Sequence, residues 1–274
     1  MHSVLEVLDI GSGARRTVLR TDEHIEAPNW SPDGDRFVVN GGGHLFDISV
    51  DGAGGLRPID TGEAVRCNND HGFSPDGSQL AVSHHHDGES MVYLLPAVGG
   101  TPRRVTPLGP SYWHGWSPDG RTLAYTANRA GQFDVYTIDV DGGAERRLTT
   151  HPAPDDGPDY SPDGATIYYN SERSGVMRVW AMDADGAHPR QLTFDEEYAD
   201  WFPHPSPDGR WCSLLSYDAD VVGHPPGKQV RLRLLDLRDG SVREVAELLG
   251  GQGTMNVPSW APDSSAFAYV RYEL

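Results

Sequence analysis

Trp30-Ser31-Pro32-Asp33-Gly34 is the stretch that decides the fold, because its aromatic-Ser-Pro-Asp-Gly pattern returns along the chain. Three close copies follow, and two later copies keep only part of the pattern: Phe73–Gly77, Trp116–Gly120, Tyr160–Gly164, Pro205–Gly209 and Trp260–Ser264. The steps between successive copies are 43, 43, 44, 45 and 55 residues. A nearly constant period of this size indicates a repeat architecture.

Each copy predicts a tight turn between two strands. Proline fixes φ at the second turn position, aspartate suits the third, and glycine supplies a left-handed fourth. Apolar, β-rich runs follow the turns, such as residues 36–39 and 166–169. Farther along, Asp-Gly and Gly-Gly pairs such as that ending Tyr136–Gly143 predict a hairpin. Each repeat is therefore predicted to form four antiparallel strands, named A to D, which is one blade of a β-propeller.

Six copies predict a six-bladed, all-β propeller that closes through its own ends. The chain begins with a predicted C–D hairpin over residues 5–19 and ends with a predicted A–B pair over residues 259–270. Neither piece makes a blade alone, and together they complete the last blade and remove exposed sheet edges. We expect a single propeller domain over residues 1–274.

Composition narrows the classes of function. A net charge of −18 argues against non-specific nucleic-acid binding and against docking on anionic membranes, and its plainest role is solubility. Cys67 and Cys212 fall in different predicted blades and are expected to be free thiols. The chain has no basic, apolar leader and no long apolar run, so we expect no signal peptide, no transmembrane helix and a cytoplasmic location.

The propeller plan gathers polar side chains at one mouth of the central channel. The starts of the A strands and the ends of the B strands meet at this mouth, opposite the Ser-Pro-Asp-Gly turns. Trp113 and Trp201 offer faces for a sugar ring, whereas the turn tryptophans are expected to pack between blades. The expected partner is a small saccharide-like or anionic ligand, and no organic cofactor is expected. The candidate ligand-binding residues are Asn69, Asp70, Trp113, Asp156, Glu172, Trp201, His224 and Asn256.

Histidines recur at the same mouth and suggest a metal site. Converging neutral imidazoles with an open position favour Mn²⁺ or Zn²⁺, with Ca²⁺ as a third candidate. The alternative is that each histidine hydrogen-bonds the backbone or water in a polar channel. The spacing does not show which of His84, His85 and His86 faces the channel. We take His85 as the candidate ligand from this run. The expected ligands are His71, His85, His114, His204 and Gln252.

Arg129 and Arg173 occupy matching B-strand ends in neighbouring blades. Two guanidinium groups at one mouth are suited to clamping an oxyanion, and the alternative is that they pair with nearby carboxylates. In a lyase, His71 or His114 would be the base that takes a proton next to a carboxylate or ketone. The metal with Arg129 or Arg173 would then stabilise the enolate.

The repeat also carries a family resemblance. The turn motif followed by Asp139-Val140-Asp141-Gly142-Gly143 and Arg147-Leu148-Thr149 resembles the repeat of TolB-type propellers. This resemblance implies the fold far more strongly than a function. TolB is periplasmic and has an added N-terminal domain, and neither feature is expected here. Propellers of this type also cap prolyl oligopeptidase-like enzymes, but this sequence has no Gly-x-Ser-x-Gly elbow.

Oligogalacturonate lyases carry similar repeats, in a propeller that binds a metal through histidines and a glutamine. That distant similarity implies a metal-assisted carbohydrate lyase or hydrolase. The alternative is a propeller without chemistry that binds a protein or peptide partner on one face.

Overall fold

Each complete Ser-Pro-Asp-Gly copy forms the predicted turn in the computed structural model, which describes residues 1–274. In the third copy the Ser117 hydroxyl donates to Asp119 at 2.6 Å and accepts from the amide of Thr122 at 2.9 Å. The other four complete copies repeat both hydrogen bonds. Gly120 has φ 69°, and Ser264, which replaces glycine in the last copy, takes the same left-handed conformation with φ 64°.

The turns also touch one another around the ring. A Cβ built on Gly77 would lie 3.7 Å from Pro32, and one on Gly164 would lie 3.4 Å from Pro118. Each turn glycine therefore faces the proline of the preceding copy. Gly34 faces Pro262 and so joins the first turn to the last.

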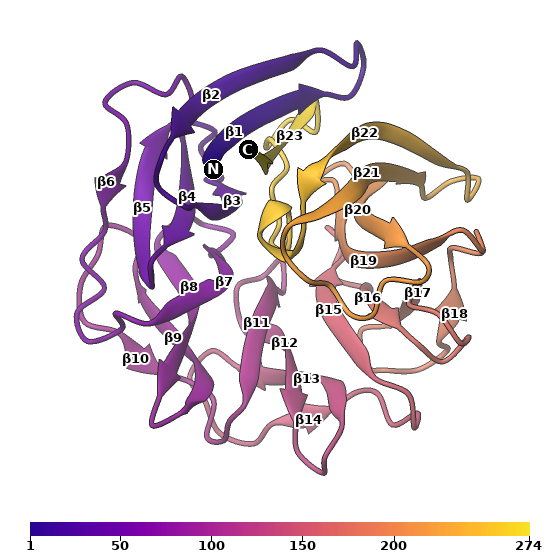
Figure 1. Ribbon diagram of the computed structural model, residues 1–274. Helices are drawn as coiled ribbons and strands as arrows, with labels where there is room; N and C mark the ends of the chain where they lie inside the picture. Colours follow the sequence, from indigo (N-terminus) through magenta and orange to yellow (C-terminus); the bar gives the residue numbers. More distant parts are fainter.

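Five blades contain four antiparallel strands each, ordered from the channel outward as the chain runs (Figure 1). Blade 1 consists of β3 (Glu26–Trp30), β4 (Arg36–Gly41), β5 (His44–Ser49) and β6 (Arg57–Pro58). Blade 2 consists of β7 (Cys67–Phe73), β8 (Gln79–His86), β9 (Glu89–Pro96) and β10 (Arg103–Arg104). Blade 3 consists of β11 (Ser111–Trp116), β12 (Thr122–Asn128), β13 (Phe133–Asp139) and β14 (Arg146–Arg147). Blade 4 consists of β15 (Asp155–Tyr160), β16 (Thr166–Ser171), β17 (Arg178–Asp183) and β18 (Arg190–Gln191). Blade 5 consists of β19 (Tyr198–Pro205), β20 (Trp211–Asp218), β21 (Lys228–Asp236) and β22 (Val242–Gly250).

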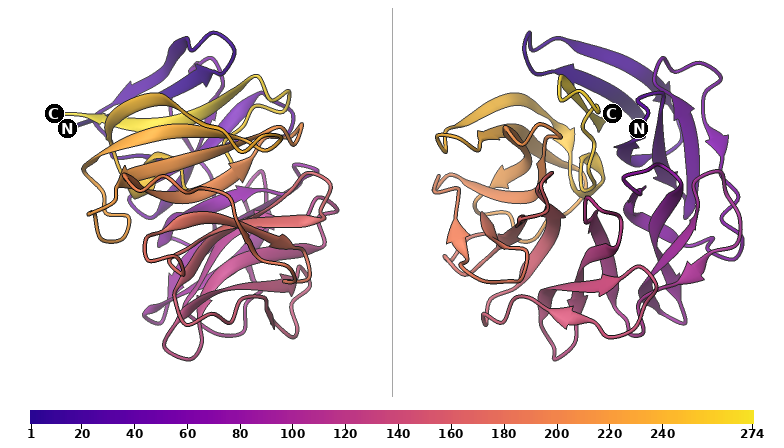
Figure 2. Two further views of the ribbon diagram at one scale, coloured as in Figure 1. Left: turned by 90° about the vertical axis from the view of Figure 1, so that its right-hand side faces the viewer. Right: turned by 180° about the vertical axis from the view of Figure 1, so that it is seen from behind.

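The sixth blade joins the two ends of the chain, as the sequence predicts. It contains β1 (His2–Asp9), β2 (Arg15–Thr21) and β23 (Ala266–Glu273), in the order β2-β1-β23. β1 and β23 pair antiparallel over their full length, so the termini lie side by side (Figure 2). The predicted A strand of this blade is reduced to a single bridge between Trp260 and Phe267.

The innermost strands are bulged where they approach the channel mouth. The pairings of β3, β7, β11, β15 and β19 with their neighbours all shift register, for example between Asp156 and Asp159. Gly157 and Phe202 hold equivalent positions before a proline and have φ 58° and 52°. Because a bulge redirects the side chains around it, these shifts decide which residues face the channel.

Aromatic side chains pack between the blades as predicted. Trp116 and Trp260 are buried, and each indole N–H donates to a backbone carbonyl of a neighbouring blade. Trp113 belongs to the same packing, because it is 1% exposed and lies so close to Gly72 that a Cβ there would meet its ring at 2.3 Å. The one helix is a 3-10 turn, η1 (Gln252–Thr254). No helix has the length and apolarity needed to cross a membrane.

Candidate functional site

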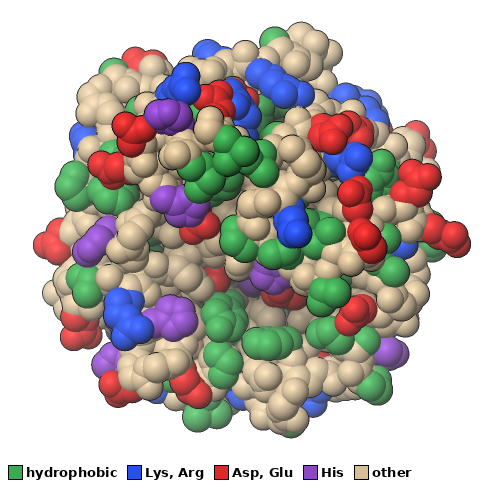
Figure 3. Space-filling view, viewed as in Figure 1, with side chains coloured by type: hydrophobic (Ala, Val, Ile, Leu, Met, Phe, Trp, Pro, Cys, Tyr) green, Lys and Arg blue, Asp and Glu red, His purple; other side chains and the backbone are tan.

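A cavity of about 470 Å³ opens at the predicted mouth of the channel. In the space-filling view, histidine and acidic side chains appear in a hollow that apolar side chains surround (Figure 3). Blades 2 to 5 and η1 all contribute to its wall. The lining residues are Asp70, Tyr112, His114, Thr126, Phe133, Pro154, Asp156, Glu172, Met177, Trp201, Phe202, Val222, Gly223, His224 and Gln252.

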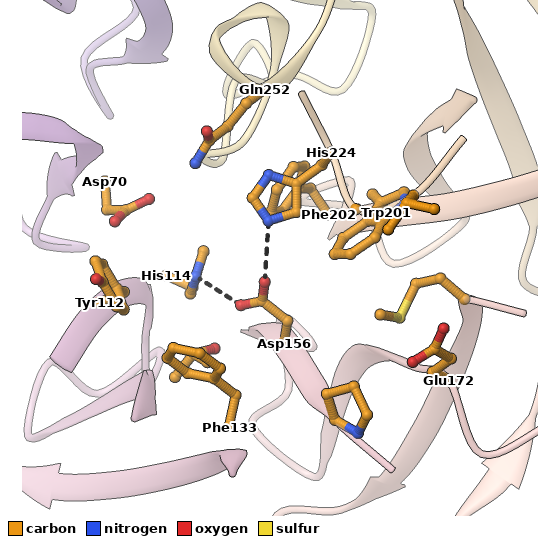
Figure 4. Close-up of a pocket in the computed structure, with 15 residues that line it drawn as sticks. Asp70, Tyr112, His114, Phe133, Asp156, Glu172, Trp201, Phe202, His224 and Gln252 are labelled. Carbon is orange, nitrogen blue, oxygen red and sulfur yellow. Dashed lines mark ion pairs between the residues drawn. The ribbon is translucent and has the colours of Figure 1, made fainter. Parts of the chain in front are cut away.

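Asp156 lies between two imidazole rings in this cavity (Figure 4). His114 Nε2 is 3.3 Å from Asp156 Oδ1, and His224 Nε2 is 3.7 Å from Asp156 Oδ2. Phe202 stacks on His114 with ring centroids 6.0 Å apart. The Trp201 and His224 rings pack edge to face with centroids 4.5 Å apart. Strands β11, β15 and β19 and the loop between β20 and β21 thus place a carboxylate between two imidazole rings, each of which packs against an aromatic side chain.

The protonation states of this group follow from burial and charge. Burial acts to raise the pKa of Asp156, but the hydrogen bond and charge of His114 outweigh it and hold that pKa at about 2. Burial acts to lower the pKa of His114, and the carboxylates of Asp156 and Asp70 raise it above its ordinary value. The pKa of His224 is lowered because burial dominates. His114 is therefore the imidazole that pairs with Asp156 as a cation, and His224 is the one that is more readily neutral.

Asp70 is the second buried carboxyl group of the cavity. Its two oxygens accept from Asn256 Nδ2 at 2.8 Å and from Asn68 Nδ2 at 2.7 Å. Only 3% of its surface is exposed, and burial raises its pKa from 3.8 to about 6 despite these hydrogen bonds. Asp70 therefore changes protonation state near neutral pH, which is common for groups at functional sites.

The structure brings seven of the predicted site residues to this cavity. They are Asp70, His114, Asp156, Glu172, Trp201, His224 and Gln252. Asn256 lies directly behind Asp70 as its hydrogen-bond donor. Asn69 is buried next to Asp70 in the chain but does not line the cavity.

The predicted histidine cluster is not assembled, and no group of three or more His, Cys, Asp or Glu side chains is placed to hold a metal ion. His71 is fully buried away from the cavity and bonds the Val38 carbonyl through Nε2 at 3.1 Å. His204 is also fully buried, with Nδ1 at 3.0 Å from Asp159. Neither His85 nor its neighbours in the run lines the cavity. Burial in the channel strands accounts for the positions of His71 and His204.

The two arginines take the alternative arrangement, in which they pair with carboxylates instead of clamping an anion. Arg129 Nε donates to Glu145 at 2.6 Å, and Arg173 reaches both oxygens of Asp155 at 2.9 and 3.1 Å. Both guanidinium groups therefore bind carboxylates of their own blades and line no part of the cavity. Trp113 likewise packs in the core instead of offering a face to a sugar.

Several lining residues were outside the predicted site. Tyr112, Phe133, Met177 and Phe202 all belong to the apolar part of the wall. Phe133 and Met177 lie where the B–C loops of blades 3 and 4 return to the sheet, and this matching position is the signal that could have identified them. The position of Phe202 in the wall depends on the bulge of β19, and no residue pattern predicts that bulge.

Comparisons with known proteins agree with this architecture. The TolB β-propeller domain family matches residues 109–273. An uncharacterized protein of Agrobacterium fabrum is 50% identical over 273 residues, covering 99% of this chain and 93% of that protein. The solved structure of a TolB-like protein from Agrobacterium tumefaciens is 49% identical, with a TM-score of 0.97 over 100% of this chain and 99% of that one.

A more distant structural match is to another propeller. An oligogalacturonate lyase in complex with manganese is 15% identical, with a TM-score of 0.60 over 93% of this chain and 74% of that one. At this identity the match establishes a shared fold only.

Proposed function

The chain belongs to the TolB β-propeller family, and within that fold we propose that the channel-mouth cavity binds a small polar organic ligand such as a saccharide. One observation carries the proposal: a cavity of about 470 Å³ brings aromatic walls together with buried acid–base groups from four blades. Small-molecule sites are concave, largely apolar and furnished with a few convergent polar groups. Tyr112, Phe133 and Trp201 provide the walls, and Asp70, His114 and Asp156 provide the polar groups.

The side chains present favour a neutral or cationic ligand over the anionic one first expected. Asp70, Asp156 and Glu172 all face the cavity, and His114 offsets only one of them. Arg129 and Arg173 are bound to Glu145 and Asp155. A carboxylate ligand would therefore enter a cavity with an excess of negative charge, which opposes binding.

A metal-assisted lyase step is not part of the proposal. Its metal would need ligands that His71, His85 and His204 do not bring to the cavity, and its enolate would need a free cation. Proton exchange with a bound ligand remains within reach of these residues. Asp70 is best suited to it, because a general base works most efficiently with a pKa near the working pH.

A protein or peptide partner is the second candidate, and the apolar rim of the cavity favours it. Val222 is 93% exposed and Phe133 is 37% exposed. Such a partner would insert an apolar side chain between these two residues and cover the cavity.

Ligand-observed NMR with a library of polar fragments, including mono- and disaccharides, tests the proposal. We expect saturable binding that weakens about tenfold or more in Asp156→Asn and in His224→Ala. Asp119→Asn, on the opposite face, is the matched control and should leave binding unchanged. Binding that is indifferent to both cavity variants would contradict the proposal. A peptide captured by the wild type but not by Val222→Asp would instead support the second candidate.

A further inference from the structure

Asp70 is the one buried carboxylate of the molecule that no basic side chain pairs with. Six of the seven buried carboxylates have an arginine or histidine nitrogen within 3.7 Å. The pairs are Glu6–Arg271, Asp134–Arg147, Asp155–Arg173, Asp159–His204, Asp200–Arg233 and Asp236–Arg210. Asp70 has two amide partners and no cation of its own, because the nearest base, His114, is bound to Asp156.

We propose that a protonated amine of the ligand supplies the missing cation and ion-pairs with Asp70. This inference rests on the proposed function and names the class of ligand, an amine-bearing small molecule such as an amino sugar. Buried charges in proteins are paired, and leaving one unpaired is costly. The position of Asp70 in the wall of an open cavity leaves room for the partner to arrive with a ligand.

The geometry leaves hydrogen-bonding capacity on Asp70 for an ammonium group. An ionised carboxylate accepts about four hydrogen bonds. The two amides use one site on each oxygen, which leaves a site on each for N–H donors of the ligand. Asn68 and Asn256 also hold the carboxylate in place, so an incoming amine meets a fixed acceptor.

The walls suit an organic cation better than an inorganic one. Tyr112 lies on the same side of the cavity as Asp70, and Phe133, Trp201 and Phe202 complete the aromatic surface (Figure 4). Aromatic faces attract cations and bury the carbon body of an amine. An inorganic divalent ion prefers several oxygen ligands, whereas both amides present N–H donors to Asp70.

Matched ligand sets test this assignment at about pH 7.5, where Asp70 is ionised. One set is D-glucosamine, D-glucose and D-glucuronate, and a second is cyclohexylmethylamine, cyclohexylmethanol and cyclohexanecarboxylate. Affinities are measured by NMR titration at low salt with the wild type, Asp70→Asn and Asp119→Asn. We expect the amine to bind about tenfold or more tightly than its partners, and Asp70→Asn to abolish that preference while sparing the neutral ligand.

Asp119→Asn is the charge-matched control, because it also removes one carboxylate but lies on the opposite face of the propeller and is exposed to solvent. We expect it to change amine affinity less than about threefold. Equal binding of amine and alcohol, or an amine preference that survives Asp70→Asn, would overturn the assignment and leave the proposed function standing. Calcium chloride alone saturating Asp70 and displacing the amine would also overturn it. No saturable binding of any probe would overturn the proposed function itself.

The pH dependence of amine binding gives a second readout. Asp156, His114 and Tyr112 are the titratable groups that face Asp70 from the neighbouring blades. Asp156 stays ionised and His114 stays protonated around pH 6, whereas His224, whose pKa lies below 6.5, gains a proton as the pH falls. The part of the change in affinity that is lost in Asp70→Asn therefore reports Asp70. Amine affinity should fall as the pH drops through about 6 in the wild type, and a flat profile would contradict the assignment.

Discussion

Two aspartates on opposite faces of the propeller each accept hydrogen bonds from two side chains, yet their pKa values shift in opposite directions. Asp76, in the second turn, is exposed and accepts from the hydroxyls of Ser74 and Ser78 and from the Ser78 amide, and these hydrogen bonds lower its pKa to about 2. Asp70, at the channel mouth, accepts from two amides and is buried, and its pKa is raised to about 6. The difference between them is that Asp70 is buried without a cation of its own. Asp76 serves the turn, whereas Asp70 can still bind a cationic partner.

The two faces also differ in how regular their sequences are, and the candidate functional site lies on the less regular face. The turn face is built from a repeated solution in which every serine, aspartate and glycine satisfies its neighbours. The channel mouth uses a different residue at each equivalent position, and it contains the one buried carboxylate that lacks a basic partner. Natural proteins tolerate such local conflicts mainly where function requires them.

The largest expected effect comes from creating a second unpaired carboxylate. Arg173→Met would leave Asp155 fully buried without its guanidinium partner. We expect the free energy of unfolding to fall by about 3–5 kcal/mol in urea titrations, because breaking a buried pair exposes the full cost of the remaining charge. The double variant Arg173→Met/Asp155→Asn should recover most of that loss. A loss below about 1 kcal/mol would show that burial alone does not require a partner here.

The next effect is a stabilisation. Asp70→Asn should raise the free energy of unfolding by roughly 3 kcal/mol at about pH 8, because a pKa raised from 3.8 to about 6 makes the ionised group destabilising. The folded state binds the Asp70 proton more tightly than the unfolded state. The gain is therefore present above pH 6, shrinks as the pH falls, and vanishes below about pH 4.

The new amide can be accommodated, because Asn256 Oδ1 has no hydrogen-bond partner and can turn to accept from it. Urea titrations of both proteins across this pH range provide the measurement. A variant that is less stable than the wild type at every pH would be inconsistent with an unpaired Asp70.

A smaller effect is expected on the turn face. Ser117→Ala removes the donor to Asp119 and the acceptor for the Thr122 amide, which should cost about 1 kcal/mol. Thr150→Ala, at an exposed position whose hydroxyl makes no hydrogen bond, is the control and should change stability little. Equal urea midpoints for the two variants would mean that the repeated turn contributes no side-chain stabilisation.

The smallest expected effect is that of metal removal. Since no three-ligand group is assembled, EDTA should shift the midpoint of thermal unfolding by less than about 1 °C. A fall of several degrees that Mn²⁺ or Zn²⁺ reverses would restore the metal site predicted from the histidines.

Regular features could be predicted from the sequence, and features that depend on bulges could not. The Ser-Pro-Asp-Gly period sufficed for six blades, their closure and the location of the mouth, because turns and strand alternation are local properties. Asp156 and His114 were placed correctly by that geometry. His71 has the same distance from its turn as His114 yet faces Val38, because the bulge of β7 spans Cys67 to His71 and that of β11 spans Trp113 to Gly115.

The ion-pair partners of charged side chains were the other feature that the sequence could not predict. The sequence left open whether Arg129 and Arg173 clamp an anion or pair with carboxylates, and the structure shows pairing with a carboxylate of the same blade in both cases. Conversely, nothing in the run Asn68-Asn69-Asp70-His71 says that Asp70 is left without a cation. That property appears only when all buried carboxylates and their partners are compared in three dimensions.

The pKa of Asp70, measured by ¹³C NMR of the aspartate carboxyl groups with Asp70→Asn for assignment, tests the central claim most directly. An unpaired buried carboxylate predicts a pKa of about 6 in the ligand-free protein. It also predicts a decrease on addition of D-glucosamine and no decrease with D-glucose. A pKa at or below the ordinary value of 3.8 in the ligand-free protein would contradict it.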